Sequence, residues 1–196
     1  QAFTLPPNTI AATLGYWYNI FSVDGFNVPN AALEVDIADA AGNPIATVDT
    51  KYNTDRDPVA GTFHQVTFDL TPYATNTQLR VQFWVTSGTS GGTQFNIDDV
   101  SVAAWDSSAR GSNDNFTNAA PLSGNSANVV TTNTFATKES GEPNHANNPG
   151  GKSLWWRWSA PEPGIVTITT DGSSFDTLLA AYTGTAVNSL TRVAAN

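Results

Sequence analysis

Alternation of apolar and polar residues with a period of two constrains the fold of this chain more than any other feature. In residues 14–20 every second side chain is a large aliphatic or aromatic one, and residues 33–37, 66–70 and 79–85 repeat the pattern. Because successive side chains of a strand point to opposite faces, this pattern predicts half-buried β-strands. Turn-forming sequences separate these segments at the spacing that antiparallel sandwiches show. We therefore expect an all-β fold, with at most a turn or two of helix at 113–120.

The alternation changes phase within residues 95–102 (FNIDDVSV). The apolar residues before Asp98 have odd numbers, whereas those after Asp99 have even numbers. A β-bulge at Asp98 and Asp99 returns all of them to a common face, and bulges re-aim side chains at the rim of a sheet. Carboxylate oxygens are ligands that calcium prefers. Asp98 and Asp99 are therefore candidate calcium ligands, the alternative being a solvated acidic pair at a strand end.

A change in composition divides the chain into two domains. The sequence AAWDSSARGS (103–112) interrupts the alternation with small and polar residues, after which Asn, Pro and Gly become frequent. Strand-like patterns then return in three segments: SLWWRWSA, GIVTITTD and DTLLAAYTG. We expect two antiparallel β-sandwich domains in tandem, at 1–105 and 113–196, joined by a linker at 106–112.

Charge and cysteine content exclude several classes of function. The net charge is −9 and the acidic residues are dispersed, so a nucleic-acid partner is not expected. The chain has no cysteine, which excludes disulfides, thiolate metal sites and cysteine nucleophiles. No apolar run reaches the roughly 20 residues that span a bilayer, so membrane insertion is not expected. Abundant Thr, Asn, Gly and Ser without cysteine are typical of exported bacterial proteins, which predicts a secreted or cell-surface location.

The stretch SGEPNHANNPGGKSLWWRW (140–158) places Glu142 and His145 close to three tryptophans. A histidine beside a glutamate is an acid–base pair, but neither a GxSxG elbow nor an HExxH motif accompanies it. We therefore expect a rigid corner and no enzyme. Glu142 is also a candidate calcium ligand, as are Asp114 and Asp176, and Asp176 is alternatively the cap of a turn.

The tryptophans define a candidate carbohydrate-binding surface. Trp156 and Trp158 share one strand face, which we expect in the core, and this leaves Trp155 on the other face. An aromatic face stacks on the apolar face of a sugar ring. Trp155, Trp17 and Trp84 are therefore candidate sugar ligands, whereas the alternative for Trp155 is that it covers the back of a sheet or an adjoining domain.

Both halves resemble known families. The first half, through LPPNT…LGYWY, FDLTPYA…LRVQFWV and IDDVSV, resembles the jelly-roll modules that accompany secreted bacterial proteases and glycosidases, which are related to MAM-like and galactose-binding-like domains. The second half, through GEPNHA…GGKSLWWRW and SSFDTLLAAYTG, is similar to the β-sandwich repeats of bacterial extracellular proteins that are akin to pre-peptidase C-terminal domains. Such domains are non-catalytic accessories in adhesins, surface repeats and exoenzymes, and some bind calcium or polysaccharide.

The resemblances imply a non-catalytic structural or adhesive module pair in a bacterial surface or secreted assembly. They also imply strands before QAFTLPP and after VAAN, so that either this is part of a larger chain or another chain supplies strands. The first alternative is therefore a filament subunit completed by strands from neighbouring copies, with QAFTLPPN as the donated segment. The second is a pair of carbohydrate-binding accessory domains of a protease or glycosidase. The expected partners are copies of the chain itself, further domains or polysaccharide, and the expected ion is structural calcium.

Overall fold

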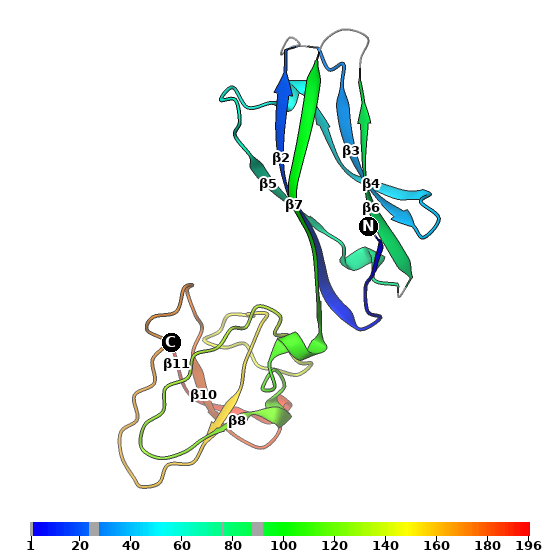
Figure 1. Cartoon of the computed structure of the whole chain (residues 1–196). Coiled ribbons are helices and arrows are strands. Elements are labelled where there is room, and N and C mark those ends of the chain that lie inside the picture. Colours follow the sequence, from blue (N-terminus) through cyan, green and yellow to red (C-terminus); the bar gives the residue numbers. More distant parts are fainter. Residues whose placement is uncertain (1, 24–27, 76, 88–91) are drawn as a thin grey trace. The chain divides into compact units, whose positions relative to one another are not determined.

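In this computed structural model the chain folds into two compact units, both built mainly from β-structure (Figure 1). The structure describes residues 2–23, 28–75, 77–87 and 92–196. Unit 1 comprises Gln1–Ser107 and unit 2 comprises Ser108–Asn196, so the boundary lies inside the expected linker. The predicted all-β fold is confirmed. No helix among the described residues is long and apolar enough to cross a membrane.

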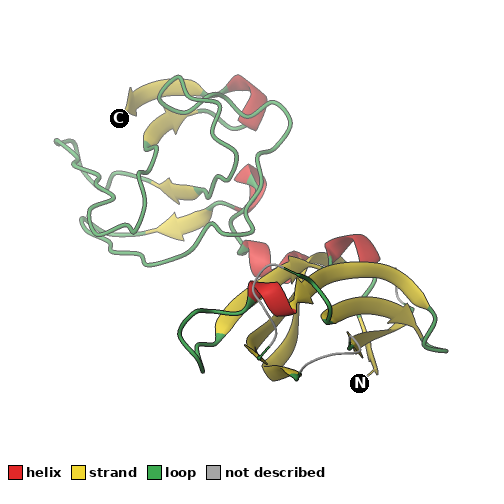
Figure 2. Ribbon diagram, turned by 90° about the horizontal axis from the view of Figure 1, so that it is seen from above, coloured by secondary structure: helices red, strands yellow, loops and turns green. Residues whose placement is uncertain are grey.

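Two antiparallel sheets form unit 1 (Figures 1 and 2). One sheet has the strand order β1-β6-β3-β4 and the other has the order β5-β2-β7. The strands predicted at 14–20, 33–37, 66–70 and 79–85 correspond to β2, β3, β5 and β6. The strand bounds are β1 Ala2–Thr4, β2 Thr9–Ser22, β3 Ala32–Asp39, β4 Pro44–Tyr52, β5 His64–Asp69, β6 Gln78–Thr86 and β7 Thr93–Asp106.

The core of unit 1 lies between its two sheets and is built from alternate side chains of the strands. Leu14 and Tyr16 of β2 and Val35 and Ile37 of β3 are completely buried. The Tyr16 ring meets the ring of Phe83 on β6 edge to face, with centroids 5.4 Å apart. Each buried side chain of this size stabilises the fold by about 1.5–3 kcal/mol. Unit 1 therefore has an apolar core of its own.

The bulge predicted in β7 is present. Gly15 of β2 lies opposite Ser101, whereas Trp17 lies opposite Asp98, so two steps along β2 span three along β7. Asp99 has a φ of 50°, a left-handed conformation that residues other than glycine rarely adopt. The strand then continues further than the sequence indicated, because residues 103–106 still pair with β2. Small side chains do not interrupt a ladder that the backbone itself forms.

The amino-terminal segment is used within its own unit. Ala2–Thr4 pairs with β6 of the same chain in antiparallel register. Leu5, which follows, is 2% exposed and belongs to the core of unit 1. Residues 2–4 of QAFTLPPN, the segment that the filament hypothesis named as a donated strand, therefore pair within their own unit.

Unit 2 contains two small sheets joined by long irregular segments. β8 (Ala120–Leu122) and β9 (Trp156–Trp158) pair in parallel, and β10 (Ala180–Thr183) pairs antiparallel with β11 (Thr191–Ala195). The predicted helix at 113–120 is a single 3-10 turn at Phe116–Asn118.

The strand predicted from GIVTITTD is absent from unit 2, although every residue of this unit is described. The physical reason is that residues 160–169 make no backbone–backbone hydrogen bond within the unit. A strand is defined by its backbone hydrogen bonds to a neighbouring strand. In this unit the sequence pattern is present, but no neighbouring strand bonds to it.

The buried hydroxyl of Tyr16 makes the stability of unit 1 depend on pH. It donates to Asp49 Oδ2 at 2.5 Å, and burial, followed by the neighbouring Asp49 carboxylate, holds the pKa of Tyr16 above its ordinary value. The unfolded chain therefore releases this proton first as the pH rises above about 10. The stabilisation is complete below that pH and is lost above it, by up to about 1.4 kcal/mol per pH unit.

Tyr16→Phe tests this account, because it keeps the ring and removes the hydroxyl. We expect the free energy of unfolding to fall by about 1 kcal/mol at neutral pH and its alkaline decline to become shallower. Urea unfolding followed by circular dichroism between pH 7 and 11 measures both quantities. Tyr52→Phe, at a side chain 43% exposed, is the control that leaves them unchanged. If the free energy of unfolding of Tyr16→Phe falls as steeply with rising pH as that of the wild type, the account is contradicted.

Candidate functional site

A cluster of aromatic and ionisable side chains fills the centre of unit 2. His145 Nε2 lies 2.7 Å from Glu142 Oε1, and His145 Nδ1 lies 3.0 Å from the hydroxyl of Tyr182. The ring of Trp155 packs edge to face against both His145 and Phe116, with centroids 5.4 and 5.2 Å apart. These five residues are here called the His145 cluster, and they come from the loop after residue 138, the 3-10 turn at Phe116–Asn118, the position just before β9, and β10.

A tight turn positions Glu142. The amide of Glu142 donates to the carbonyl of Glu139 at 3.2 Å, and Gly141 inside this turn has a φ of 86°. A Cβ at Gly141 would lie 2.9 Å from the Cβ of Asn188. Because other residues resist both this conformation and this approach, only glycine suits the position. The turn aims the Glu142 carboxylate inward.

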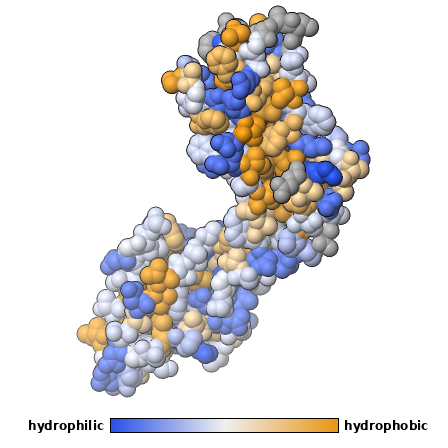
Figure 3. All heavy atoms as spheres, in the orientation of Figure 1, coloured by the Kyte–Doolittle hydropathy of each residue, from blue (hydrophilic) through white to orange (hydrophobic). Residues whose placement is uncertain are grey.

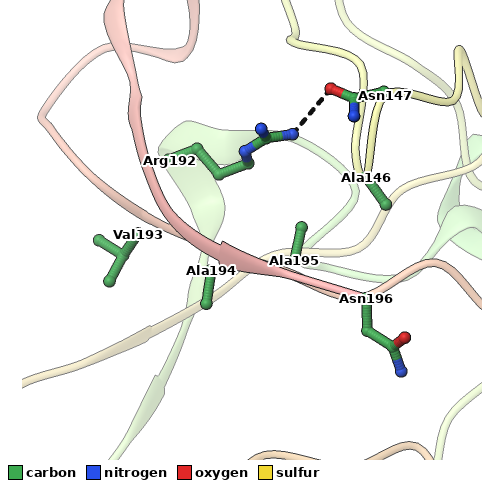
Figure 4. A pocket seen from close by; sticks show the side chains of 7 residues that line it. All are labelled: Ala146, Asn147, Arg192, Val193, Ala194, Ala195 and Asn196. Atoms are coloured by element: carbon green, nitrogen blue, oxygen red, sulfur yellow. Dashed lines mark hydrogen bonds between the residues drawn. The ribbon is translucent and has the colours of Figure 1, made fainter.

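A second turn positions His145. The amide of Asn148 donates to the carbonyl of His145 at 2.7 Å. Between them Ala146 and Asn147 have φ values of 48° and 65°, the signature of a type I′ turn. Arg192 on β11 donates to Asn147 Oδ1 at 2.9 Å, as Figure 4 shows. Side-chain hydrogen bonds hold both turns of this corner, and its rigidity stays a prediction.

The Glu142 carboxylate is buried, and both of its oxygens make hydrogen bonds. Its side chain is 1% exposed. While one oxygen contacts His145, the other accepts from the amide of Glu139 at 3.0 Å and from the hydroxyl of Ser153 at 2.9 Å. Burial raises the pKa of Tyr182, with Arg192 opposing and the Glu142 charge adding to the rise. Tyr182 therefore keeps its proton at neutral pH.

The hydrogen-bonding groups of this arrangement bond to one another and to neighbouring residues. Both ring nitrogens of His145 have partners inside the cluster, and the two oxygens of Glu142 bond to His145, Glu139 and Ser153. A general base needs a lone pair that a substrate can reach. The adjoining depression, about 390 Å³, is lined by Ala146, Asn147 and residues 192–196 (Figure 4), and among these lining residues Arg192 is the one ionisable side chain.

The candidate calcium ligands of unit 1 lie at the bulge. Asp98 and Asp99 are both exposed, and Asp98 Oδ1 accepts from the amide of Asp99 at 2.8 Å. Within the part of the chain that the structure describes, no three histidine, aspartate or glutamate side chains gather as metal ligands would. Calcium binding at the bulge stays a prediction.

The candidate ligands of unit 2 have separate surroundings. Asp114 is 7% exposed and its two oxygens accept from the amide and the hydroxyl of Thr137, at 2.6 and 2.9 Å. Glu142 belongs to the His145 cluster, and Asp176 is exposed. Asp114 and Glu142 each accept from a backbone amide, and calcium binding in unit 2 stays a prediction.

The orientation expected for the three neighbouring tryptophans is reversed. Trp155 is 8% exposed, whereas Trp156 and Trp158 are 37% and 39% exposed. The amide of Trp155 donates to the carbonyl of Asn113 at 2.9 Å, and its ring packs inside the His145 cluster. The expectation that Trp155 is free to stack on a sugar is therefore wrong.

The other two candidate sugar ligands lie on opposite outer faces of unit 1. Trp84 on β6 alternates with the core residue Phe83 and is 53% exposed, with Glu34 of β3 opposite it. Trp17 on β2 alternates with Tyr16, is half-buried and points out of the other sheet. The two rings therefore do not form one binding platform.

Sequence reasoning missed two members of the His145 cluster. Tyr182 lies in the predicted strand DTLLAAYTG, and Phe116 lies in the predicted helical turn, but no spacing indicated that either one meets His145. Comparison with protein-family models, with curated proteins and with solved structures found no match.

Proposed function

We propose that the chain is a non-catalytic pair of β-sandwich modules with a structural or adhesive role in a secreted or surface assembly. The observation that carries this proposal is the distribution of apolar burial. Of the sixteen buried apolar residues in the described parts of the chain, thirteen belong to unit 1. Unit 2 buries only Ala119, Ala136 and Trp155.

Unit 2 exposes the side chains from which a core is normally built (Figure 3). Ten large apolar residues of this unit are more than a third exposed. They are Val129, Val130, Trp156, Trp158, Ile165, Val166, Ile168, Phe175, Leu178 and Val193.

So small a core does not offset the conformational entropy that folding costs, about 1–2 kcal/mol per residue for the backbone alone. Exposed apolar patches rimmed by polar residues mark interaction surfaces. Unit 2 is therefore best explained as a module whose stability depends on further protein surface, as expected in an assembly. The closed hydrogen bonding of the His145 cluster supports a structural role for its ionisable residues.

Negative-stain electron microscopy and light scattering on one sample of the native protein test this proposal. We expect ordered assemblies much larger than a single chain. Loss of these assemblies on adding a calcium chelator is the result expected if calcium at Asp98 and Asp99 contributes. Dispersed single chains at every concentration contradict the assembly role.

A carbohydrate-binding accessory role is the second candidate, and the exposure of Trp84 favours it. Its ring lies open beside the Glu34 carboxylate, a combination of a flat apolar face and a hydrogen-bond acceptor that suits a sugar. We expect soluble polysaccharides to change the tryptophan fluorescence of the wild type and of Trp17→Ala, but not that of Trp84→Ala. Unchanged wild-type fluorescence, or an equal response from Trp84→Ala, contradicts this role.

A further inference from the structure

Two extended segments of unit 2 leave their backbone groups and their apolar side chains without partners. Residues 125–132 and 160–169, here called the open segments, make no backbone–backbone hydrogen bond within this fully described unit. Val130 is 94% exposed and Ile165 is 100% exposed. Unpaired backbone beside apolar side chains is a template for strand addition.

The open segments begin side by side. Asn125 Nδ2 donates to Glu162 Oε1 at 3.1 Å, and Trp158 Nε1 donates to the carbonyl of Gly124 at 2.9 Å. They continue from β8 and β9, which are already paired in parallel. An added strand beside them therefore extends an existing small sheet.

Two sheet edges of unit 1, β4 and β7, are protected, whereas the open segments are not. The edge strand β4 carries Asp49 and Lys51 and has two register shifts against β3, and β7 carries three aspartates, of which Asp98 and Asp99 lie at its bulge. Charges and bulges are the devices by which native sheets block further pairing. The windows 126–132 (SANVVTT) and 164–170 (GIVTITT) contain neither a charge nor a proline. Such windows are those most disposed to pair with another strand.

The distribution of charge indicates which surface two copies bring together. Unit 1 has eleven acidic and three basic residues, a net charge of −8, and unit 2 has six acidic and five basic residues, a net charge of −1. Two copies that meet through unit 1 repel each other, while two that meet through unit 2 do not. A nearly neutral, apolar and unpaired surface is also self-complementary.

We propose that a second copy of the chain covers the open segments, with residues 164–170 of the two copies paired antiparallel across a two-fold axis. Such an isologous contact needs one patch that fits itself, and this segment supplies it. Pairing gives hydrogen-bond partners to the backbone groups of alternate residues in this segment, and it places Val166 and Ile168 against the same two residues of the partner copy. The inference rests on the proposed assembly role, and it names the surface and the partner.

Sedimentation velocity on the full chain, from micromolar to several hundred micromolar, tests the proposal. We expect a reversible dimer for the wild type. Val166→Lys combined with Ile168→Lys is expected to weaken the dimer by about 100-fold, because two charges would be buried without partners. These side chains are 52% and 57% exposed, so the change removes little packing within one chain. Ile45→Lys, at a residue of unit 1 that is 53% exposed, is the matched control and is expected to dimerise like the wild type.

A second variant separates backbone pairing from apolar contact. Thr167→Pro removes one backbone donor while it keeps every apolar side chain, and we expect it to weaken the dimer as well. The proposal is overturned if the wild type stays monomeric, or if the double lysine variant dimerises as tightly as the wild type. Large assemblies that persist in the double lysine variant leave the assembly role standing and show that this surface is wrong. Dispersed single chains in both electron microscopy and sedimentation velocity contradict both the assembly role and the proposed dimer.

Discussion

Glu142→Ala is expected to unfold unit 2 while it leaves unit 1 folded. The change removes the acceptor of three groups, the His145 ring, the Glu139 amide and the Ser153 hydroxyl, at a side chain that is 1% exposed. Each buried polar group left without a partner costs about 1–3 kcal/mol, so the total loss exceeds about 3 kcal/mol. Unit 2 buries few apolar residues that offset such a loss.

Differential scanning calorimetry and near-ultraviolet circular dichroism measure this effect. The unfolding transition of unit 2 and the signal from the packed Trp155 ring are expected to disappear, and the transition of unit 1 is expected to stay. Glu162→Ala is the matched control, since this exposed glutamate makes one hydrogen bond, to Asn125, and its loss costs less than about 0.5 kcal/mol. Equal losses from the two substitutions contradict the role given to the His145 cluster.

Asn53→Ala is expected to lower the free energy of unfolding of unit 1 by about 3 kcal/mol. The Asn53 side chain is completely buried, and its Oδ1 accepts from the amides of Asn30 and Ala31 at 2.9 and 3.3 Å. Its Nδ2 donates to the carbonyl of Val28 at 3.1 Å. One side chain therefore satisfies three backbone groups of the segment that enters β3.

Urea unfolding of the full chain, followed through the transition of unit 1, gives the size of this loss. Asn8→Ala is the control, because Asn8 is exposed and bonds only weakly to Asp106 at 3.3 Å. We expect the control to change the free energy of unfolding by less than about 0.5 kcal/mol. A loss at Asn53 no larger than that at Asn8 shows that water replaces these bonds, and it contradicts the account.

The fold of unit 1 was predictable because its determinants are local. Alternation along residues 14–20 specifies which face of β2 is buried, and the phase change at Asp98 and Asp99 located the bulge correctly. The role of Asn53 was not predictable, because its partners Asn30 and Ala31 are more than twenty residues away along the chain. Local pattern gives the period of an element but not the polar bonds between elements.

The candidate site was likewise predictable only where its determinants are local. The parity of Trp155, Trp156 and Trp158 was correct, since Trp155 does point away from the other two. Which face is covered depends on Phe116 and Tyr182, whose approach is tertiary, and the sequence therefore assigned the wrong face to the core.

The absence of the strand predicted from GIVTITTD has a different explanation. Its β-propensity and its alternation are genuine properties of the sequence, and the chain itself provides no ladder for it. Local sequence preference and observed structure are expected to disagree at functional sites. Strand addition at the open segments resolves this conflict.

Hydrogen–deuterium exchange of residues 160–169, followed by mass spectrometry as a function of protein concentration, tests the central claim most directly. If a second copy covers the open segments, the exchange of these amides slows as concentration rises, while the amides of β2 stay protected throughout. Exchange of residues 160–169 as fast as in an unstructured peptide, at every concentration and beside a protected β2, contradicts the claim.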